Sequence, residues 1–408
     1  MNKKQLTDML IKDYQFFKDF TNFTPESPGF GLTSDHNLDP NRASIASTGY
    51  MLCSLIIGCE HQLLTRDEAL YKSKQTLKTI LNLPHHDGFY PHFLYRESGE
   101  IYGKSEYSTI DSMLLFMGVL AVDAYFNDSE IEAMTHALFN RIQWKNWLTT
   151  YQDKKVFYMA YNPHPKGDYI TDAPGYIYHW HMYAEQLMMY FLYPYEDGYE
   201  LYKNMEKIKG YYQKHHYIYS PGNTLFIYQF PHVFINFKDY IDGEQISWFD
   251  NSKNAIYGHQ QLSMDLKHTY QTFSESYFGF NASDSPNGYR VFHAIPNVDH
   301  KVITDGTVAP FGLVGTLPFD ERLGLNSIES MLNIKDLDSK YGFYDAFNLE
   351  HDTWISKKYI GIDKGHEMLS LDLYLNQKIQ NLISNHPRIQ KGYERLQFIK
   401  KGGNYGND

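Results

Sequence analysis

Predicted helices that come in pairs, with loops between the pairs, constrain the fold of this sequence more than any other feature. Apolar residues recur at helical spacing over residues 3–22, 43–61 and 67–83. The alternation of helix, helix and loop continues at irregular intervals of roughly 50 to 70 residues. About twelve helices in such hairpins are typical of an all-α toroid, although periodicity alone does not show that the ring closes. No linker rich in Pro, Ser or Gly interrupts the chain, so we expect one domain over residues 1–408.

The most apolar predicted helix, over about residues 108–126, begins beside two carboxylates. Ser108 is its expected N-cap and Asp111 falls in its first turn, as in a short variant of the capping box. Glu106 lies in the loop that leads into the helix. An acid in a first turn complements the helix dipole without any ligand, so this segment alone suits a structural role as well as a binding role.

Farther along, predicted helices alternate with short extended aromatic pieces. Extended pieces are expected over residues 87–95 and 156–161, and helices over about 128–147, 178–193, 199–212 and 366–383. The helix predicted over 178–193 carries Glu185 among aromatic and apolar neighbours. Such surroundings raise the pKa of a carboxyl group toward that of a general acid. The structural alternative is a core glutamate bonded to a helix neighbour.

Aromatic residues are unusually frequent, with 36 Tyr and 26 Phe. Tyrosine and tryptophan stack on sugar rings or nucleobases and also offer a polar group, although most of these residues are expected simply to pack. The formal net charge of −11 disfavours contact with a phosphate backbone, which requires a basic face. We therefore expect a sugar, and no nucleic acid, as the partner.

Membrane and disulfide chemistry are also disfavoured. Residues 1–5 lead into an amphipathic helix without the apolar region of a signal peptide, and no segment is expected to reach the length of a membrane span. Cys53 and Cys59 would face different ways on a helix and are not expected to form a disulfide. We expect a cytoplasmic protein with no membrane partner.

The sequence has no motif that marks nucleotide, serine-hydrolase or metal chemistry. It lacks a Gly-rich phosphate loop, a Gly-x-Ser-x-Gly turn and a cysteine nucleophile motif. Histidine pairs occur at His179 and His181 and at 215–216, but no third ligand follows at zinc spacing. We therefore expect neither a metal nor a cofactor.

An ordered set of short segments resembles the glucoamylase-like (α/α)6-barrel proteins, which include the β-1,2-glucan-degrading enzymes of glycoside hydrolase family 144. The matching segments extend over nearly the whole chain: residues 31–35, 37–39, 46–49, 105–115, the surroundings of Glu185, 282–284, 305–310, 341–348 and 359–363. The resemblance implies an (α/α)6 barrel with short strand-like pieces in the loops. It also implies a cleft in which acidic residues hydrolyse glucosidic bonds.

Carried over residue by residue, the resemblance implies that Asp111 and Glu185 are the catalytic carboxylates. Where the β-1,2-glucanases have a motif more like Asp-x-x-Glu, this chain has Ser-Thr-Ile-Asp at 108–111. Glu106, in the variant Ser-Glu-x-Ser-Thr, is the candidate replacement for the missing carboxylate. The departure leaves the linkage and the acid/base assignment open.

Glycoside hydrolysis needs one carboxyl group to protonate the leaving oxygen and a second to act as base or nucleophile. The remaining site candidates are polar or aromatic residues that could contact a sugar: Asp39, Arg42, Tyr178, Trp180, His181, His232, Asp284, Asp345 and Asp363. Structural roles compete with these assignments. Asp39 and Arg42 could form an ion pair with each other, and the loop aspartates could cap turns.

The sequence therefore predicts a glycoside hydrolase that cleaves β-linked gluco-oligosaccharides, with β-1,2 linkages favoured, by carboxylate catalysis without a cofactor. A retaining transglycosylase or a sugar lyase on the same barrel is one alternative. A non-catalytic sugar-binding protein that kept the cleft is another. The sequence does not indicate chain-length preference, anomeric outcome or oligomeric state.

Overall fold

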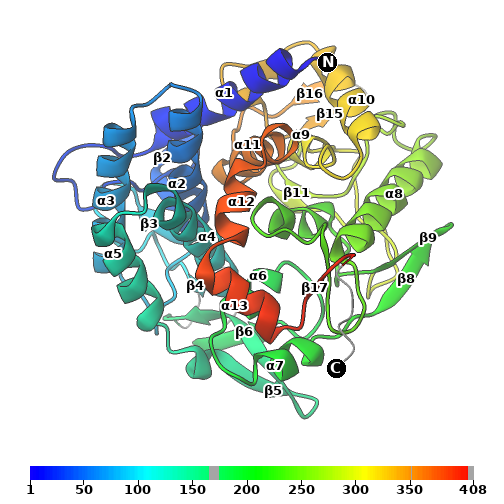
Figure 1. Cartoon of the computed structure of the whole chain (residues 1–408). Coiled ribbons are helices and arrows are strands. Elements are labelled where there is room, and N and C mark those ends of the chain that lie inside the picture. The colour runs from blue at the N-terminus through cyan, green and yellow to red at the C-terminus, as the bar shows by residue number, and fades with distance from the viewer. Residues whose placement is uncertain (165–173, 351, 403–408) are drawn as a thin grey trace.

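The helices of the chain follow one another around a ring in the computed structural model, which describes residues 1–164, 174–350 and 352–402 (Figure 1). The α-helices are α1 (Lys3–Phe20), α2 (Ile45–Glu60), α3 (Arg66–Asn82), α4 (Thr109–Phe126), α5 (Ser129–Asn140), α6 (Leu187–Leu192), α7 (Gly198–Asn204), α8 (Trp248–Leu266), α9 (Pro310–Val314), α10 (Glu321–Leu332), α11 (Gly361–Leu375), α12 (Lys378–Ser384) and α13 (Pro387–Arg395). Short 3-10 helices are η1 (Trp144–Trp147), η2 (Leu225–Tyr228) and η3 (Phe230–Val233).

Short strands lie in the connections between the helices. They are β1 (Ser34–His36), β2 (Asp39–Ser44), β3 (Phe93–Tyr95), β4 (Tyr107–Ser108), β5 (Leu148–Tyr151), β6 (Lys154–Asn162), β7 (Gly175–His179), β8 (Lys209–Tyr212), β9 (His215–Ile218), β10 (Tyr240–Ile241), β11 (Ala282–Ser283), β12 (Arg290–Val291), β13 (Asp338–Ser339), β14 (Gly342–Phe343), β15 (Phe347–Asn348), β16 (Trp354–Ile355) and β17 (Ile399–Lys400). The larger sheets are β1-β2-β3 and β4-β6-β5, with β7 also paired to β6. Strands β2 and β4 lead directly into α2 and α4, so these small sheets fix where the two helices begin.

Helices α2 and α4 are apolar on nearly every side and pack against each other in the core. Their contact requires glycine. A Cβ atom on Gly118 would lie 2.1 Å from the carbonyl oxygen of Gly49, and one on Gly49 would lie 2.3 Å from that of Leu114. Serine N-caps start both helices, because Ser44 Oγ accepts from Ser47 N and Ser108 Oγ accepts from Asp111 N.

Helix α4 corrects one expectation. It is long and apolar enough to span a membrane by length and composition, but 78% of the segment is buried inside the fold. Helices in a protein core can be as long and as apolar as a membrane-spanning helix, and α4 is such a core helix. Cys53 and Cys59 are free thiols, as expected.

Four predicted helices end early or do not form as predicted. The segment 128–147 is helical only to Asn140 and then turns into η1, and 199–212 ends at Asn204 and continues as β8. The C-terminal helix is divided between α11 and α12 at Gln377, whose φ is 56°. Residues 178–193 are not one helix, because the segment up to His179 pairs with β6 as strand β7 and α6 begins only at Leu187.

Candidate active site

A cavity of about 570 Å³ lies where α4 and α11 begin. Its walls come from the β1–β2 hairpin, β4 and α4, the connection between β7 and α6, the β11–β12 hairpin and the start of α11. The titratable side chains that line it are Asp35, His36, Arg42, His92, Glu106, Asp111, Glu185, Tyr289, Lys358 and Asp363. The three predicted catalytic carboxylates thus line the same cavity.

His92 stands between two of these carboxylates. Its Nδ1 lies 2.9 Å from Oε1 of Glu106, and its Nε2 lies 3.6 Å from Oδ1 of Asp111. Burial alone would lower the pKa of His92, but Asp111 and Glu106 together raise it to about 9. The imidazole is therefore a cation at neutral pH, and it lies between the carboxyl groups of Glu106 and Asp111.

The first turn of α4 fixes the position of Asp111. Ser108 Oγ accepts from Asp111 N at 3.3 Å and donates to Asp111 Oδ2 at 2.5 Å, which confirms the predicted N-cap. The adjacent Thr109 hydroxyl donates to the Met159 carbonyl at 2.7 Å and accepts from Trp180 Nε1 at 3.0 Å. These bonds join the start of α4 to β6 and to the segment that carries Glu185.

Glu185 lies in a turn before α6 and not in a helix, which corrects the prediction for this segment. The buried Gln186 side chain holds this turn, since it accepts from Ala184 N and donates to the Met182 carbonyl. Burial, and secondarily the charge of Asp111, raise the pKa of Glu185 to about 8, while His92 lowers it. Among the described residues no side chain hydrogen-bonds the Glu185 carboxyl. The alternative of a core glutamate bonded to a helix neighbour is therefore wrong.

A second acidic group lies at the start of α11. Burial raises the pKa of Asp363 well above its ordinary range, and the neighbouring Asp345 carboxyl adds to that rise by its charge and a hydrogen bond. The pKa of Asp345 is raised to about 6, mainly by burial. Asp345 Oδ2 accepts from Asp284 N at 2.7 Å, and Asp284 in turn binds Lys358 Nζ at 2.8 Å. Asp363 and Lys358 line the cavity, whereas Asp345 and Asp284 support them from behind.

Asp39 and Arg42 do not pair with each other, contrary to one structural alternative. Arg42 Nη2 lies 2.7 Å from Asp35 Oδ2, while Asp39 Oδ2 accepts from the Tyr102 hydroxyl at 3.1 Å. Arg42 and Asp35 line the cavity, and Asp39 does not.

The aromatic and histidine candidates are divided between the cavity and other places. Trp180 lines the cavity, but Tyr178 and His181 do not. His181 contacts Tyr151 and His179 instead. His232 is buried beside Ser252, with Nε2 2.9 Å from the hydroxyl, and burial lowers its pKa to about 3. It is therefore a neutral core residue in this structure.

Several cavity residues were not predicted. Asp35 and His36 lie in a long turn-rich loop, and Tyr289 follows a turn-dense segment, so turn composition was the signal available for them. His92 lies next to Pro91 in an aromatic extended piece and carries no sequence signal of its own. Among the described residues, no three His, Cys, Asp or Glu side chains are grouped so that they could hold a metal ion.

Comparison with known proteins places this arrangement in a family. Residues 177–387 match the Glycoamylase family model, described as "Putative glucoamylase". A relative from Parabacteroides distasonis, the exo β-1,2-glucooligosaccharide sophorohydrolase (non-reducing end), is 22% identical over 98% of this chain. The chain spans 59% of the length of that relative.

Two solved structures show the same fold over 98% of this chain. One is a "putative glucoamylase" from Bacteroides uniformis, with a TM-score of 0.84, 22% identity and 98% of its own chain covered. The other is the endo-β-1,2-glucanase from Chitinophaga pinensis in complex with sophorotriose and glucose, with a TM-score of 0.81, 19% identity and 99% coverage. The ring of helices is therefore an (α/α)6 barrel, as the sequence predicted.

Proposed function

This chain belongs to the Glycoamylase family, and on that premise we propose that it hydrolyses glucosidic bonds in β-1,2-linked gluco-oligosaccharides. Glu185 is the general acid and Asp111 is the second catalytic carboxylate. The observation that carries the proposal is the pairing, in one cavity, of a carboxyl group whose pKa is raised to about 8 with a carboxylate that a histidine cation stabilises. Glycoside hydrolysis requires one carboxyl group that donates a proton and a second that acts as base or nucleophile.

In the proposed reaction, Glu185 donates its proton to the glycosidic oxygen as the bond from the anomeric carbon to that oxygen breaks. A water molecule attacks the anomeric carbon, and Asp111 accepts a proton from that water. The His92 cation lies 3.6 Å from Asp111, and Ser108 fixes the orientation of the Asp111 carboxyl group. If Asp111 instead attacks the anomeric carbon directly, a covalent glycosyl intermediate forms and the configuration is retained.

Asp363 is the third carboxyl group at the cavity wall. Because burial and the neighbouring Asp345 carboxyl raise its pKa well above the ordinary range, Asp363 suits a hydrogen-bond donor to a sugar hydroxyl better than a base. Lys358 and Arg42 also line the cavity and add charged donors for sugar hydroxyls. Trp180 and Tyr289 add aromatic surface.

The linkage is supported by relatives whose names specify it. The sophorohydrolase and the Chitinophaga endo-glucanase both act on β-1,2-linked glucose by name. This chain has the same barrel fold as the Chitinophaga endo-glucanase. Its similarity to the sophorohydrolase extends over 98% of this chain. The β-1,2 linkage is therefore the substrate class to test first.

The test is incubation of the purified protein with gluco-oligosaccharides of defined linkage, followed by proton NMR of the products. We expect turnover of the β-1,2-linked oligosaccharides, with little or none for β-1,3, β-1,4, β-1,6 or α-1,4 linkages. The anomer formed first distinguishes the inverting from the retaining course. Saturable binding of one oligosaccharide without turnover of any would contradict the proposal and favour a sugar-binding protein.

A further inference from the structure

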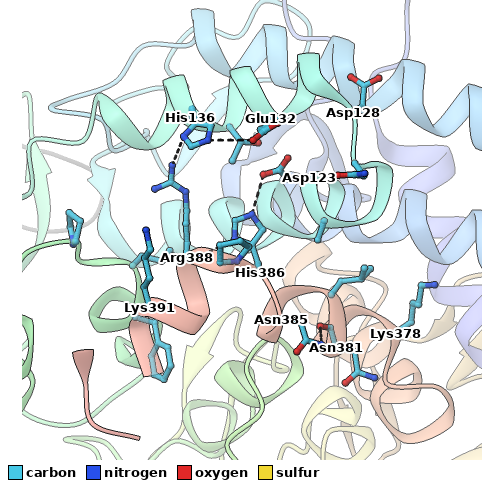
Figure 2. Close-up of a pocket in the computed structure, with 18 of the residues that line it drawn as sticks. Asp123, Asp128, Glu132, His136, Lys378, Asn381, Asn385, His386, Arg388 and Lys391 are labelled. Carbon is cyan, nitrogen blue, oxygen red and sulfur yellow. Dashed lines mark hydrogen bonds and ion pairs between the residues drawn. The ribbon is translucent and has the colours of Figure 1, made fainter. Parts of the chain in front are cut away.

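A second cavity, of about 860 Å³, lies at the far ends of the helices that begin at the active site (Figure 2). Helix α4 carries Asp111 near its start and Asp123 near its end, and α11 runs from Asp363 to a terminus capped by Asn376. At 1.5 Å per residue, each helix separates the two cavities by roughly 18–20 Å. The second cavity therefore cannot be a subsite of the first.

Three cations line the second cavity from one helix. Arg388, Lys391 and Arg395 are spaced so that they lie on one face of α13, and all three are part of the cavity wall. Figure 2 shows Arg388 and Lys391 side by side, with Arg388 turned toward His136. No carboxylate among the described residues forms an ion pair with any of the three.

Neither arginine is hydrogen-bonded to a carboxylate among the described residues. Arg388 donates to His136 Nδ1 at 3.1 Å and lies 4.4 Å from the centre of the Phe139 ring. Arg395 donates to the Phe191 carbonyl at 2.8 Å, and its buried Nε has no hydrogen-bond partner. Burial lowers the pKa of both arginines, while the nearby charge of Asp123 partly offsets that effect at Arg388. A half-buried guanidinium without a carboxylate is costly unless an anion neutralises it.

The acids of the cavity are occupied elsewhere or exposed. Asp123 Oδ2 lies 3.1 Å from Nε2 of His386, and a dashed line marks this contact in Figure 2. Asp128 pairs with Lys74 outside the cavity at 2.9 Å. Glu132 is 65% exposed and 3.8 Å from His136. Positive charge is therefore in excess along α13.

The rest of the wall offers neutral hydrogen-bonding groups. Thr135 is only 1% exposed and lines the cavity, yet its buried hydroxyl has no hydrogen-bond partner. Asn127 and Asn381 also line the cavity, and their side-chain amides make no hydrogen bond to other described residues. Amides and hydroxyls of this kind recognise the hydroxyl groups of a ligand. The volume is that of a site for a small organic molecule and far exceeds the volume of a lone inorganic anion.

We propose that this second cavity binds an anionic sugar, with its phosphate or carboxylate at Arg388, Lys391 and Arg395 and its hydroxyls toward the Asn127, Asn381 and Thr135 side. Guanidinium groups bind both kinds of anion by paired hydrogen bonds. The site is separate from the proposed catalysis and does not depend on it.

The test is isothermal titration calorimetry of the full chain with glucose 6-phosphate, glucuronate, inorganic phosphate and glucose. The variants are Lys391→Gln and Arg388→Gln, and the matched control is Lys335→Gln, an exposed lysine outside the cavity. We expect glucose 6-phosphate or glucuronate to bind the wild type and the control equally, and each cavity variant roughly tenfold or more weakly. The tighter of the two sugars identifies the anion. Because Lys391 is exposed, its variant keeps the test valid even if Arg388→Gln disturbs folding.

Three results would overturn the proposal. One is the absence of binding by either anionic sugar at concentrations up to about 10 mM. Another is binding that both cavity variants leave unchanged, which would place the site elsewhere. The third is binding of glucose or inorganic phosphate as tight as that of the anionic sugar. That result would show that the cavity does not recognise the anionic group and the sugar hydroxyls together.

Discussion

The Nε2 atom of His92 lies 3.6 Å from Oδ1 of Asp111. The other ring nitrogen is bonded to Glu106, so one imidazolium serves two carboxylates that the chain supplies from the start of α4 and the loop before it. The charge of Asp111 raises the pKa of Glu185 and the charge of His92 lowers it, so the loss of that cation would raise the pKa of Glu185 further. His92 thus sets the charge of the site, and its removal has consequences that can be measured.

The first prediction concerns stability against pH. Because the folded-state pKa of His92 is raised from 6.5 to about 9, its stabilising effect is complete below pH 6.5 and is lost as the pH rises through 9. In the variant His92→Gln, the loss of unfolding free energy between pH 6.5 and 9 should be smaller than in the wild type by roughly 1–3 kcal/mol. Urea unfolding at the two pH values measures this. An equal loss in both proteins would show that His92 does not titrate as described.

The second prediction concerns the pH dependence of catalysis. A general acid must be protonated, so kcat/KM should fall as the pH rises through the pKa of Glu185 at about 8. The charge of His92 lowers that pKa, so His92→Gln should move the alkaline limb of the pH profile to higher pH. Initial rates from pH 5 to 10 check both statements. A limb that stays in place in the variant would contradict the assignment of this limb to Glu185.

The third prediction concerns substrate binding. Tyr289 lines the active-site cavity and yet is 56% exposed, as expected for a ring that awaits a sugar face. Tyr289→Ala should raise KM roughly tenfold with little change in kcat. Tyr211→Ala is the matched control, because Tyr211 is 64% exposed and lies outside this cavity. Equal KM values for the two variants would contradict a role for Tyr289 in substrate binding.

The fourth prediction concerns the barrel core. A methyl group on Gly118 would collide with the backbone of Gly49 on the facing helix, where nothing can rotate away. Gly118→Ala should therefore lower the free energy of unfolding by roughly 1–3 kcal/mol, although alanine is the better helix former. Urea denaturation measures it. A variant as stable as the wild type would mean that α2 and α4 can separate without cost.

The helices of the first third were predictable because their boundaries have local causes. Ser108 is the N-cap of α4, as expected, and Thr65 caps α3 in the same way; both helices begin within a residue or two of the prediction. The segment before Glu185 failed for a non-local reason. In strand β7, Ile177 pairs with Ala160 and His179 pairs with Tyr158 of β6. The sequence of residues 178–193 alone does not predict that pairing.

The candidate site was predictable to the same extent. Glu106, Asp111 and Glu185 line one cavity. They could be predicted because their segments carry motifs that can be recognised in the sequence. His92 could not be found, since its role depends on two carboxylates that only the folded chain brings to it. His232 resembled a binding residue in sequence, yet burial beside Ser252 makes it part of the core.

The most direct test of the account is the kinetics of Glu185→Gln on two substrates. With a β-1,2-linked gluco-oligosaccharide, whose leaving group needs a proton, kcat should fall by roughly 10²–10⁴. With the 4-nitrophenyl β-glycoside of the same sugar, whose leaving group needs no proton, the loss should be far smaller, while Asp111→Asn should impair both substrates. Equal losses on the two substrates, or no loss on either, in a variant folded by circular dichroism would contradict the assignment of Glu185 as the general acid.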